Sequence, residues 1–409
     1  MEWAYYDWDQ GHHVNSIMSS EKRTFPDGFL WGASTAAYQV EGGIENADWS
    51  KAGHEGKVPV AGRACDFYNR YESDFDIAVG IGMNAQRFSI EWARIEPEEG
   101  KFDEKEIEHY RAVFAALKKR NLKSIGNLWH FTLPLWFAER GGFLHKDAPA
   151  VFARYCAYVI EKLGAETDLW ITINEPLVYA GASYMGGTWP PFHKNPLTFL
   201  RVFSALINSH KAAYEAMKKK RSAIQIGIAK NNIDFISNWN PLNKLLCVFV
   251  DWFWNHRFLG AMSEHQDFIG LNHYRQHTFG ATKEEKAKTV RSDMGWGLHS
   301  ESLYNCLIGL KPYELPVYVS ENGIADAADT RRAQFLRDAA LAAYRAIQDG
   351  VQLKGYFYWS LLDNYEWAFG FEKRFGLIEI NYDTLERKVR PSAIVYSELC
   401  RTNALPDGT

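Results

Sequence analysis

Leu169-Trp170-Ile171-Thr172-Ile173-Asn174 is followed directly by Glu175 and Pro176. The six residues are mostly apolar and include β-branched and aromatic side chains, a pattern that predicts a buried β-strand. Proline has no backbone N–H to donate to a neighbouring strand, so the chain must leave the sheet at Pro176. This stretch therefore predicts a buried strand with a carboxyl group placed directly at its end.

Apolar runs of the same kind recur along the chain, with helical patterns between them. Further strands are expected at Phe29–Ser34, Ala85–Glu91, Ser124–Trp129, Ile224–Ala229, Asp267–Asn272, Val317–Ser320 and Gly355–Ser360. Among the helices we expect Glu104–Arg120, Ala148–Leu163, Leu197–Lys220 and Arg331–Asp349. Strands that alternate with amphipathic helices indicate parallel βα units. Eight such units predict an α/β fold, a single (β/α)8 TIM barrel whose chemistry lies at the carboxyl ends of the strands.

The barrel is expected to take up residues 21–409, because no linker rich in Pro, Gly or Ser divides the chain. Residues 1–20 carry several aromatic side chains and a histidine pair, but neither the basic region nor the continuous apolar region of a secretory signal. We expect an N-terminal extension that is disordered or was added upstream, with Met18 as a candidate native start. The alternative is an aromatic anchor that packs on the barrel.

Composition and charge argue against several classes of partner. The chain of 409 residues is 46% hydrophobic and 23% charged, with a net charge of -4 and a pI of about 6.4. These values give no reason to expect nucleic acid or a membrane surface as partner, and no apolar run approaches the ~18 residues of a membrane span. The five cysteines are scattered, with no CxxC pair, so we expect a reducing, cytoplasmic compartment.

No sequence signal for a cofactor or a metal ion stands out. The stretch Gly80–Ala85 formally fits a GxGxxA loop, but it follows a helical pattern and precedes a strand, the reverse of the order in a dinucleotide-binding fold. The thirteen histidines show no HExxH or comparable metal spacing, and there is no GxSxG or Walker motif. We therefore expect a reaction that uses neither a cofactor nor a metal.

A second strand also ends in a carboxyl group, in Val319-Ser320-Glu321-Asn322-Gly323. A single glutamate at the end of a buried strand is more commonly a salt-bridged core residue. Here there are two such glutamates, each next to an asparagine, and their strands face each other across the barrel mouth. Hydrolysis of a β-glycoside with retention needs a pair of carboxyl groups about 5 Å apart, which this arrangement can supply. Glu175 and Glu321 are therefore the predicted catalytic pair.

The two carboxyl groups need different pKa values, because two that lie close together cannot both ionise easily. We assign the raised pKa to Glu175, as the acid that protonates the leaving oxygen and later takes a proton from water. Glu321 is expected to stay ionised as the nucleophile, with Arg87 and the hydroxyl of Tyr274 as its partners.

Further motifs follow one another along the chain: Phe29-Leu30-Trp31-Gly32-Ala33-Ser34, Tyr38-Gln39-Val40-Glu41-Gly42, Arg87-Phe88-Ser89-Ile90-Glu91-Trp92, Trp129-His130-Phe131-Thr132-Leu133-Pro134, Asn272-His273-Tyr274 and Trp359-Ser360-Leu361-Leu362-Asp363-Asn364-Tyr365-Glu366-Trp367. In this order they resemble glycoside hydrolase family 1, the β-glucosidase and β-galactosidase family. The resemblance runs from Phe25 to about Leu399 and implies a TIM-barrel enzyme without a cofactor.

The resemblance implies a role for each matching position. It places in the innermost sugar subsite Gln39, His130, Asn174, Glu366 and Trp367, with Trp359 as its floor. Trp296 is expected to contact the leaving group, which is called the aglycone. Arg87, Asn272 and Tyr274 are expected to support the nucleophile. Glu366 stands where relatives that cleave 6-phosphorylated sugars need a cationic or hydroxyl-rich site, so an unphosphorylated sugar is expected.

The expected reaction is the hydrolysis of terminal, non-reducing β-D-glucosides in small glycosides or oligosaccharides, with β-galactosides and β-fucosides as further substrates. Two segments depart from the family's pattern, because Lys230–Gln266 and Trp296–Pro316 are both short. These shortened aglycone-side loops are expected to open the entrance, to weaken contacts with the aglycone and to leave apolar surface for a second copy of the chain in a homo-oligomer. His273 stands where an aromatic residue is common, and we expect it to pack as a neutral side chain.

Two alternatives stay open at this point. An open aglycone side also suits transfer of the sugar to another sugar or an alcohol instead of water. A non-catalytic, sugar-binding scaffold is the other alternative. The shortened aglycone-side loops are the only feature that supports this alternative, and the intact carboxyl pair argues against it.

Overall fold

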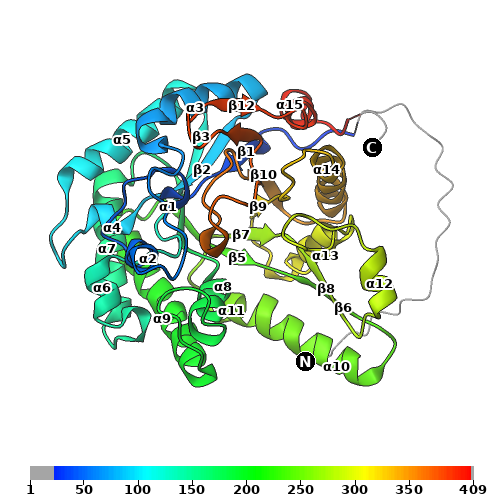
Figure 1. The fold of residues 1–409 in the computed structure, drawn as a ribbon, viewed down its shortest axis with the longest axis horizontal. Coiled ribbons are helices and arrows are strands. Elements are labelled where there is room, and N and C mark those ends of the chain that lie inside the picture. Colours follow the sequence, from blue (N-terminus) through cyan, green and yellow to red (C-terminus); the bar gives the residue numbers. More distant parts are fainter. Residues whose placement is uncertain (1–22, 407–409) are drawn as a thin grey trace.

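The structure is a computed structural model that describes residues 23–406. Its centre is a closed barrel of eight parallel strands, as the sequence predicts, with neighbours in the order β1-β10-β9-β7-β5-β4-β3-β2 (Figure 1). The barrel strands are β1 (Leu30–Ser34), β2 (Ala85–Ser89), β3 (Lys123–Asn127), β4 (Leu169–Asn174), β5 (Gln225–Asn231), β7 (Phe268–His273), β9 (Val317–Asn322) and β10 (Leu353–Trp359). The extension expected at residues 1–20 lies outside the described residues.

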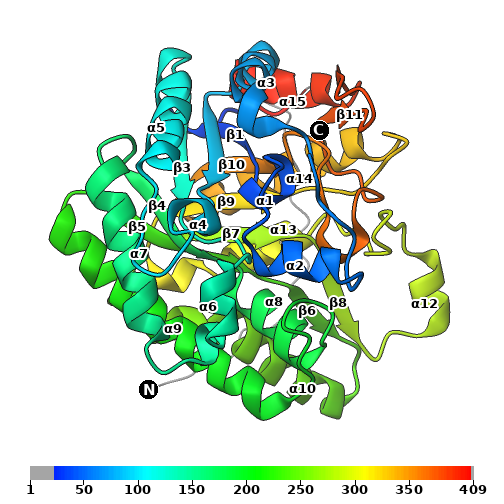
Figure 2. The ribbon, with the colours of Figure 1, turned by 60° about the vertical axis from the view of Figure 1, so that its left-hand side comes forward.

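Helices surround the barrel and cover its outer face (Figures 1 and 2). The longer ones are α3 (Phe67–Ile81), α5 (Glu104–Lys119), α7 (Ala148–Leu163), α9 (Pro196–Lys220), α10 (Pro241–Asp251), α14 (Arg332–Gln348) and α15 (Ala393–Thr402). The short ones are α1 (Ala37–Val40), α2 (Asp48–His54), α4 (Trp92–Ile95), α6 (Leu135–Glu139), α8 (Pro176–Ala180), α11 (Arg257–Ala261), α12 (Lys283–Lys288) and α13 (Ser302–Ile308). Single turns of 3-10 or π-helix are η1 (Gly142–Leu144), η2 (Gly181–Met185), η3 (Trp252–His256), η4 (Lys311–Tyr313) and η5 (Trp367–Phe369).

All the predicted strands are present, but three run further at their carboxyl ends than predicted. β5 continues to Asn231, β7 to His273 and β9 to Asn322, so Glu321 lies inside a strand rather than after it. The sequence prediction missed two small sheets outside the barrel, in which β6 (Asp234–Ser237) pairs with β8 (Gln276–Phe279) and β11 (Ile378–Ile380) pairs with β12 (Arg387–Val389). Strands this short hold too few residues for an alternating pattern to mark them.

Aromatic rings fill the barrel interior because they lie beside glycines on neighbouring strands. Gly32 pairs with Phe357 of β10, and Gly227 pairs in the same way with Phe268 of β7. A Cβ atom at either glycine would come within 2.7 Å of the neighbouring ring. The two rings form a buried core with Ala85, Ile125, Ile171 and Ala229. This close packing holds the strand ends, and the side chains they carry, in fixed positions.

Between β5 and β7 the chain makes an excursion away from the barrel. It forms β6, α10, η3 and α11, and α10 runs along the lower edge of the molecule in Figure 1. This excursion lies in the segment that the sequence analysis identified as short. Within residues 23–406, no helix is both long and apolar enough to cross a membrane.

Phe357→Ala is expected to lower the free energy of unfolding by about 3–5 kcal/mol, because it removes a buried ring and leaves a cavity that Gly32 cannot fill. Urea unfolding followed by circular dichroism measures the change. Phe369→Ala is the control, since that ring is 49% exposed, and it should cost under about 1 kcal/mol. Equal losses in the two variants would show that Phe357 does not support the interior packing.

Candidate active site

One cavity at the carboxyl ends of the barrel strands collects most of the predicted site residues, and its volume is about 320 Å³. The predicted residues that line it are Gln39, His130, Asn174, Glu175, Tyr274, Trp296, Glu321, Trp359, Glu366 and Trp367. Arg87 and Asn272 do not line it, but each is fully buried and donates to one of the two carboxyl groups. Among the residues that the structure describes, no cluster of His, Cys, Asp or Glu side chains could hold a metal ion.

Glu175 lies at the turn between β4 and α8. Its backbone has φ 44° and ψ 62°, in the left-handed region that few non-glycine residues adopt. The N–H of Glu175 donates to the carbonyl of Ala229, 2.8 Å away. Pro176 then starts the helix, at a position where a backbone N–H has no partner within the helix, so the missing N–H of proline costs no hydrogen bond. This sharp reversal places the carboxyl group of Glu175 in the wall of the cavity.

Two amides hold the carboxyl group of Glu175. Its Oε1 accepts from Nδ2 of Asn272 at 2.8 Å and from Nδ2 of Asn231 at 3.2 Å. The family resemblance implies that Asn272 supports Glu321, whereas its side chain donates to Glu175. The reason is geometric, because β7 lies between β5 and β9 and only the direction of the side chain decides which carboxyl group Asn272 reaches. Asn231 was missed, although it follows the fifth predicted strand closely.

Glu321 lies in β9 and is held by a cation and a phenol. Nη1 of Arg87 donates to its Oε1, and the hydroxyl of Tyr274 donates to its Oε2 at 2.5 Å. Arg87 is fully buried, and its Nη2 also donates to Oδ1 of Asn174 at 2.6 Å. A guanidinium and a hydroxyl thus donate to the two oxygens of one carboxyl group, and these bonds fix its position in the cavity wall.

Gly323 lets the chain pass directly against the end of β10. A Cβ atom there would lie 1.8 Å from the carbonyl oxygen of Trp359, so no larger residue fits this close approach. The glycine turn after Glu321 is therefore required to bring the carboxyl group and the indole of Trp359 into the wall of the same cavity.

Burial and mutual repulsion raise the pKa of two carboxyl groups in the cavity. The pKa of Glu175 is raised to about 7, first by burial and then by Glu321, against the lowering effect of its two amide donors. The pKa of Glu366 is raised to about 8, by burial and then by Glu321 and Glu175. Near neutral pH, Glu175 can therefore hold a proton while Glu321 stays paired with Arg87. An acid and a nucleophile need this division.

Two buried oxygen atoms of the lining residues have no hydrogen-bond partner within residues 23–406: Oε1 of Gln39 and Oε2 of Glu366. Nε2 of Gln39 donates to the side chain of Asn364 at 3.0 Å and to the carbonyl of Tyr365 at 2.8 Å. These bonds fix the amide and leave its oxygen as the free end. A buried acceptor without a donor costs free energy, and a sugar hydroxyl is a donor that would satisfy it.

Flat rings make up much of the remaining inner wall. The ring of His130 is stacked with those of Trp359 and Trp367, with centroids 5.9 and 6.1 Å away. Burial lowers the pKa of His130 well below its usual range, with a smaller effect from Arg87, so its ring is neutral. Uncharged rings of this kind offer apolar faces on which the C–H face of a sugar can pack.

Lys230 is a buried lysine that the sequence analysis did not single out. Its Nζ donates to the carbonyl of Asn231, lies 3.4 Å from Oδ1 of Asn232 and lies 5.6 Å from the ring centroid of Trp254. Burial lowers its pKa to about 7, despite the attraction of Glu175. Since Asn231, Asn232 and Trp254 line the cavity, Lys230 supports its wall from behind.

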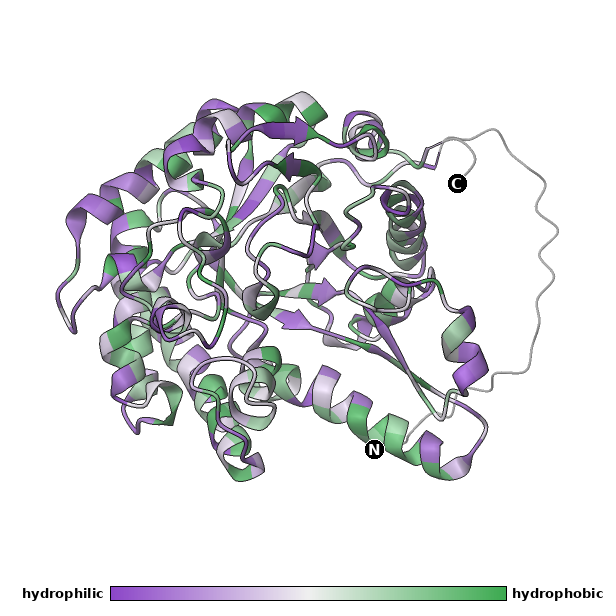
Figure 3. Ribbon diagram, in the orientation of Figure 1, coloured by the Kyte–Doolittle hydropathy of each residue, from purple (hydrophilic) through white to green (hydrophobic). Residues whose placement is uncertain are grey.

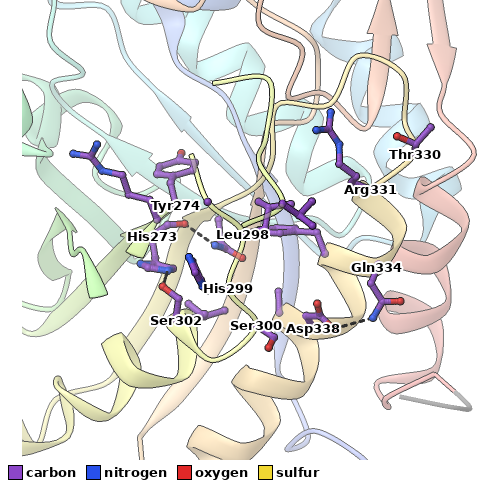
Figure 4. Close-up of a pocket in the computed structure, with 17 residues that line it drawn as sticks. His273, Tyr274, Leu298, His299, Ser300, Ser302, Thr330, Arg331, Gln334 and Asp338 are labelled. Carbon is purple, nitrogen blue, oxygen red and sulfur yellow. Dashed lines mark hydrogen bonds between the residues drawn. The ribbon is translucent and has the colours of Figure 1, made fainter. Parts of the chain in front are cut away.

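A second cavity, of about 380 Å³, has the lining residues drawn in Figure 4. Tyr274 and Arg275 line both cavities, but neither predicted catalytic carboxyl group lines the second. His273 belongs to its wall, where Nε2 accepts from the hydroxyl of Ser302 at 2.8 Å. Burial lowers the pKa of His273 to about 4. These features agree with the neutral, packing role expected for this histidine.

Comparison with known proteins identifies the family. The model of glycosyl hydrolase family 1 matches residues 21–240 and 249–405. The chain belongs to glycosyl hydrolase family 1. Beta-glucosidase A of Acetivibrio thermocellus is 33% identical over 449 aligned positions, which cover 93% of this chain and 99% of the relative. A beta-galactosidase of Pyrococcus woesei is 28% identical, with 93% of this chain and 98% of the relative covered. This family 1 member is therefore a glycosyl hydrolase, and a β-glycosidase.

Solved structures of other family 1 enzymes share the fold. The beta-glycosidase from Pyrococcus horikoshii has a TM-score of 0.87 at 33% identity, covering 95% of this chain and 97% of that one. A beta-glucosidase from Thermotoga maritima, in complex with glucoimidazole, has a TM-score of 0.89 at 30% identity, covering 94% and 100%. The alignment with the Acetivibrio relative spans 449 positions, more than the 409 residues of this chain. Family 1 relatives therefore carry segments that this chain lacks.

In Glu321→Gln, the pKa of Glu175 is expected to fall below about 7, because the repulsion by Glu321 disappears while burial keeps it above the ordinary value. The pKa of Glu366 should fall as well, since Glu321 also raises it. A carbon-13 NMR titration of the carboxyl groups measures both, with exposed Glu398→Gln as the control. Unchanged pKa values would show that the carboxyl groups are not coupled.

Lys230→Met is expected to raise the free energy of unfolding, and to do so more at about pH 6 than at about pH 10. The folded chain loses the Lys230 proton near pH 7, whereas an ordinary lysine keeps it to about 10.5. The unfolded state thus binds more protons between these values, and the destabilising effect of the lysine fades as the pH rises. Urea unfolding at both pH values tests this.

The matched control is Lys123→Met, at the exposed start of β3, which should change little at either pH. A gain from Lys230→Met that does not vary with pH would contradict the buried charge.

Proposed function

We propose that the protein is a retaining, exo-acting β-glycosidase that removes a sugar from the non-reducing end of small β-glycosides. The observation that carries the proposal is the unequal environment of two carboxyl groups that line one cavity. Neutral amides donate to Glu175, whereas the guanidinium of Arg87 donates to Glu321. This inequality supplies an acid and a nucleophile from two side chains of the same kind.

In the first step, the carboxylate of Glu321 attacks the anomeric carbon and the bond to the leaving oxygen breaks. Glu175 gives its proton to that oxygen, and the sugar remains as an ester on Glu321. In the second step, a water molecule gives a proton to Glu175 while its oxygen displaces Glu321 from the anomeric carbon. The released sugar keeps the β configuration, and both carboxyl groups return to their starting states.

We assign recognition of the sugar to Gln39, Glu366 and the surrounding rings. The unpartnered oxygens of Gln39 and Glu366 would accept from sugar hydroxyls, and the indole of Trp367 would pack beside them. The substrates are β-D-glucosides, with β-galactosides and β-fucosides accepted as well. A 6-phosphorylated sugar is disfavoured, because its charge would add to the repulsion that already raises the pKa of Glu366.

Trp296 and Arg275 form the proposed surface for the leaving group. The guanidinium of Arg275 lies 6.0 Å from the ring centroid of Trp296, and Tyr274 packs against the same indole at 5.7 Å. The cavity volume of about 320 Å³ is at the small end for ligand sites, which supports removal of one sugar at a time.

We place the enzyme in the cytoplasm. The observation in favour is that all five cysteines are free thiols and four of them are buried. Disulfides are rare in reducing compartments and common in secreted proteins. The small β-glycosides proposed as substrates would therefore be cleaved inside the cell.

A 2-deoxy-2-fluoro β-glucoside with a good leaving group should leave its fluorosugar on Glu321, because fluorine slows both steps while the good leaving group keeps the first one fast enough for the ester to accumulate. Mass spectrometry of the digested protein locates the label. A label on another residue would overturn the assignment of the nucleophile.

Glu175→Ala should lower kcat/KM by about 10²–10⁴-fold for an alkyl β-glucoside. The loss should be much smaller for a dinitrophenyl β-glucoside, whose leaving oxygen needs no proton. Steady-state kinetics on the two substrates measures the contrast, with exposed Glu398→Ala as the control. An equal loss on both substrates would remove Glu175 as the acid.

A further inference from the structure

The outer face of α10 carries a continuous set of exposed apolar side chains. Leu242 is 76% exposed, Leu245 is 70% exposed and Phe249 is 58% exposed. Trp252, which follows α10 directly, is 48% exposed. The complete set, here called the α10 face, is Trp239, Leu242, Leu245, Leu246, Val248, Phe249 and Trp252. Figure 3 shows the mostly hydrophobic helix along the lower edge of the molecule.

The spacing of these residues makes a stripe. Leu242, Leu245, Phe249 and Trp252 follow one another at intervals of three, four and three residues, which is the spacing of the contact seam between two paired helices. On the opposite side, Cys247 is buried, where α10 packs on β6 and β8. Both charged residues of the helix lie far from the stripe, since Lys244 and Asp251 are about 140–160° around the helix from Phe249.

Four of the seven side chains of the α10 face, Leu242, Leu245, Leu246 and Val248, lie outside the part of the chain that the family model matches. The family 1 model matches the chain up to residue 240 and resumes at residue 249, so it leaves most of α10 unmatched. The helix also lies outside the active-site cavity, because none of its residues lines it. A role in holding the sugar therefore does not explain these apolar side chains.

We propose that the α10 face binds the same face of a second copy of this chain. In a two-fold arrangement the two helices run antiparallel, so that Leu245 of one copy packs against Phe249 of the other, and Leu242 against Trp252. Such an interface is self-complementary, as a two-fold contact must be. It contains no charged side chain that would lose its water without gaining a partner.

The size of the α10 face fits this occupant. An exposed aromatic side chain presents about 150–250 Å², so the seven side chains at their exposed fractions offer on the order of 800 Å² per copy. That is the area each partner contributes to a standard protein interface. It also exceeds the largest apolar patch of a typical monomer, about 300–600 Å².

The charges of α10 favour a protein partner over a lipid surface. Helices that lie in a membrane interface carry a polar face rich in Lys and Arg, which binds anionic headgroups. The charged residues of α10 are one lysine and one aspartate, Lys244 and Asp251, and the whole chain has a net charge of -4. The helix therefore lacks the cluster of basic side chains that would attract it to anionic lipid headgroups.

Multi-angle light scattering on the full chain tests the proposal. The expected mass is twice the 46.9 kDa of one chain, falling to a single chain on dilution. The double variant Leu245→Glu/Phe249→Glu should give the single-chain mass at every concentration, with kcat/KM on a nitrophenyl β-glucoside unchanged as proof of folding. Ile394→Glu is the matched control, because Ile394 is 72% exposed on α15, and it should leave the mass doubled.

A second measurement separates the lipid alternative. Flotation with vesicles of phosphatidylcholine and phosphatidylglycerol should leave the wild-type chain in the unbound fraction. A single-chain mass for the wild type overturns the proposal. The proposal is also overturned if the wild-type chain floats with the vesicles and the double variant does not, because the α10 face would then bind a membrane. A doubled mass that survives in the double variant would overturn it by placing the interface elsewhere.

Discussion

Of the three carboxyl groups in the cavity, only Glu321 receives a hydrogen bond from a cation within residues 23–406, and the proposed chemistry of the site depends on this difference. Arg87 donates to Glu321, whereas amides donate to Glu175. Burial together with repulsion from Glu321 therefore raises the pKa of Glu175 to about 7 and that of Glu366 to about 8. Because amides rather than a cation donate to Glu175, its raised pKa lets it hold near neutral pH the proton that the proposed mechanism requires.

The barrel is what makes this distribution of charge stable. Arg87 comes from β2, Glu175 follows β4 and Glu321 lies in β9, so three strands that are not neighbours must hold three side chains to within a few tenths of an ångström. A shift of one residue in the pairing of any of these strands would turn its side chain to the other face. The glycine–phenylalanine pairs inside the barrel fix the register of β1 with β10 and of β5 with β7, and these strands are the neighbours of β2, β4 and β9.

The parts of this arrangement that depend on neighbouring residues could be predicted from the sequence. Strand ends that carry a carboxyl group next to an asparagine indicate both the barrel and the proposed catalytic pair. The partner of Asn272 could not be predicted, because it depends on the direction in which a side chain leaves β7. Lys230 is also a polar residue at a strand end, and only the packing of Trp254 over it shows its burial. The exposure of the apolar side chains of α10 could not be predicted either, because an apolar sequence pattern does not show whether other residues cover it.

The short excursion between β5 and β7 can coexist with an intact environment of the proposed acid, Glu175, for a structural reason. Both donors to Glu175 lie on the barrel itself, since Asn231 ends β5 and is paired in register with Asn272 of β7. The chain leaves the barrel after the first donor and returns before the second. Loss or gain of residues between them changes the wall near Trp254 and the outer surface, but it leaves these two hydrogen bonds in place. The hydrogen bonds that hold Glu175 are therefore independent of the length of the excursion between β5 and β7.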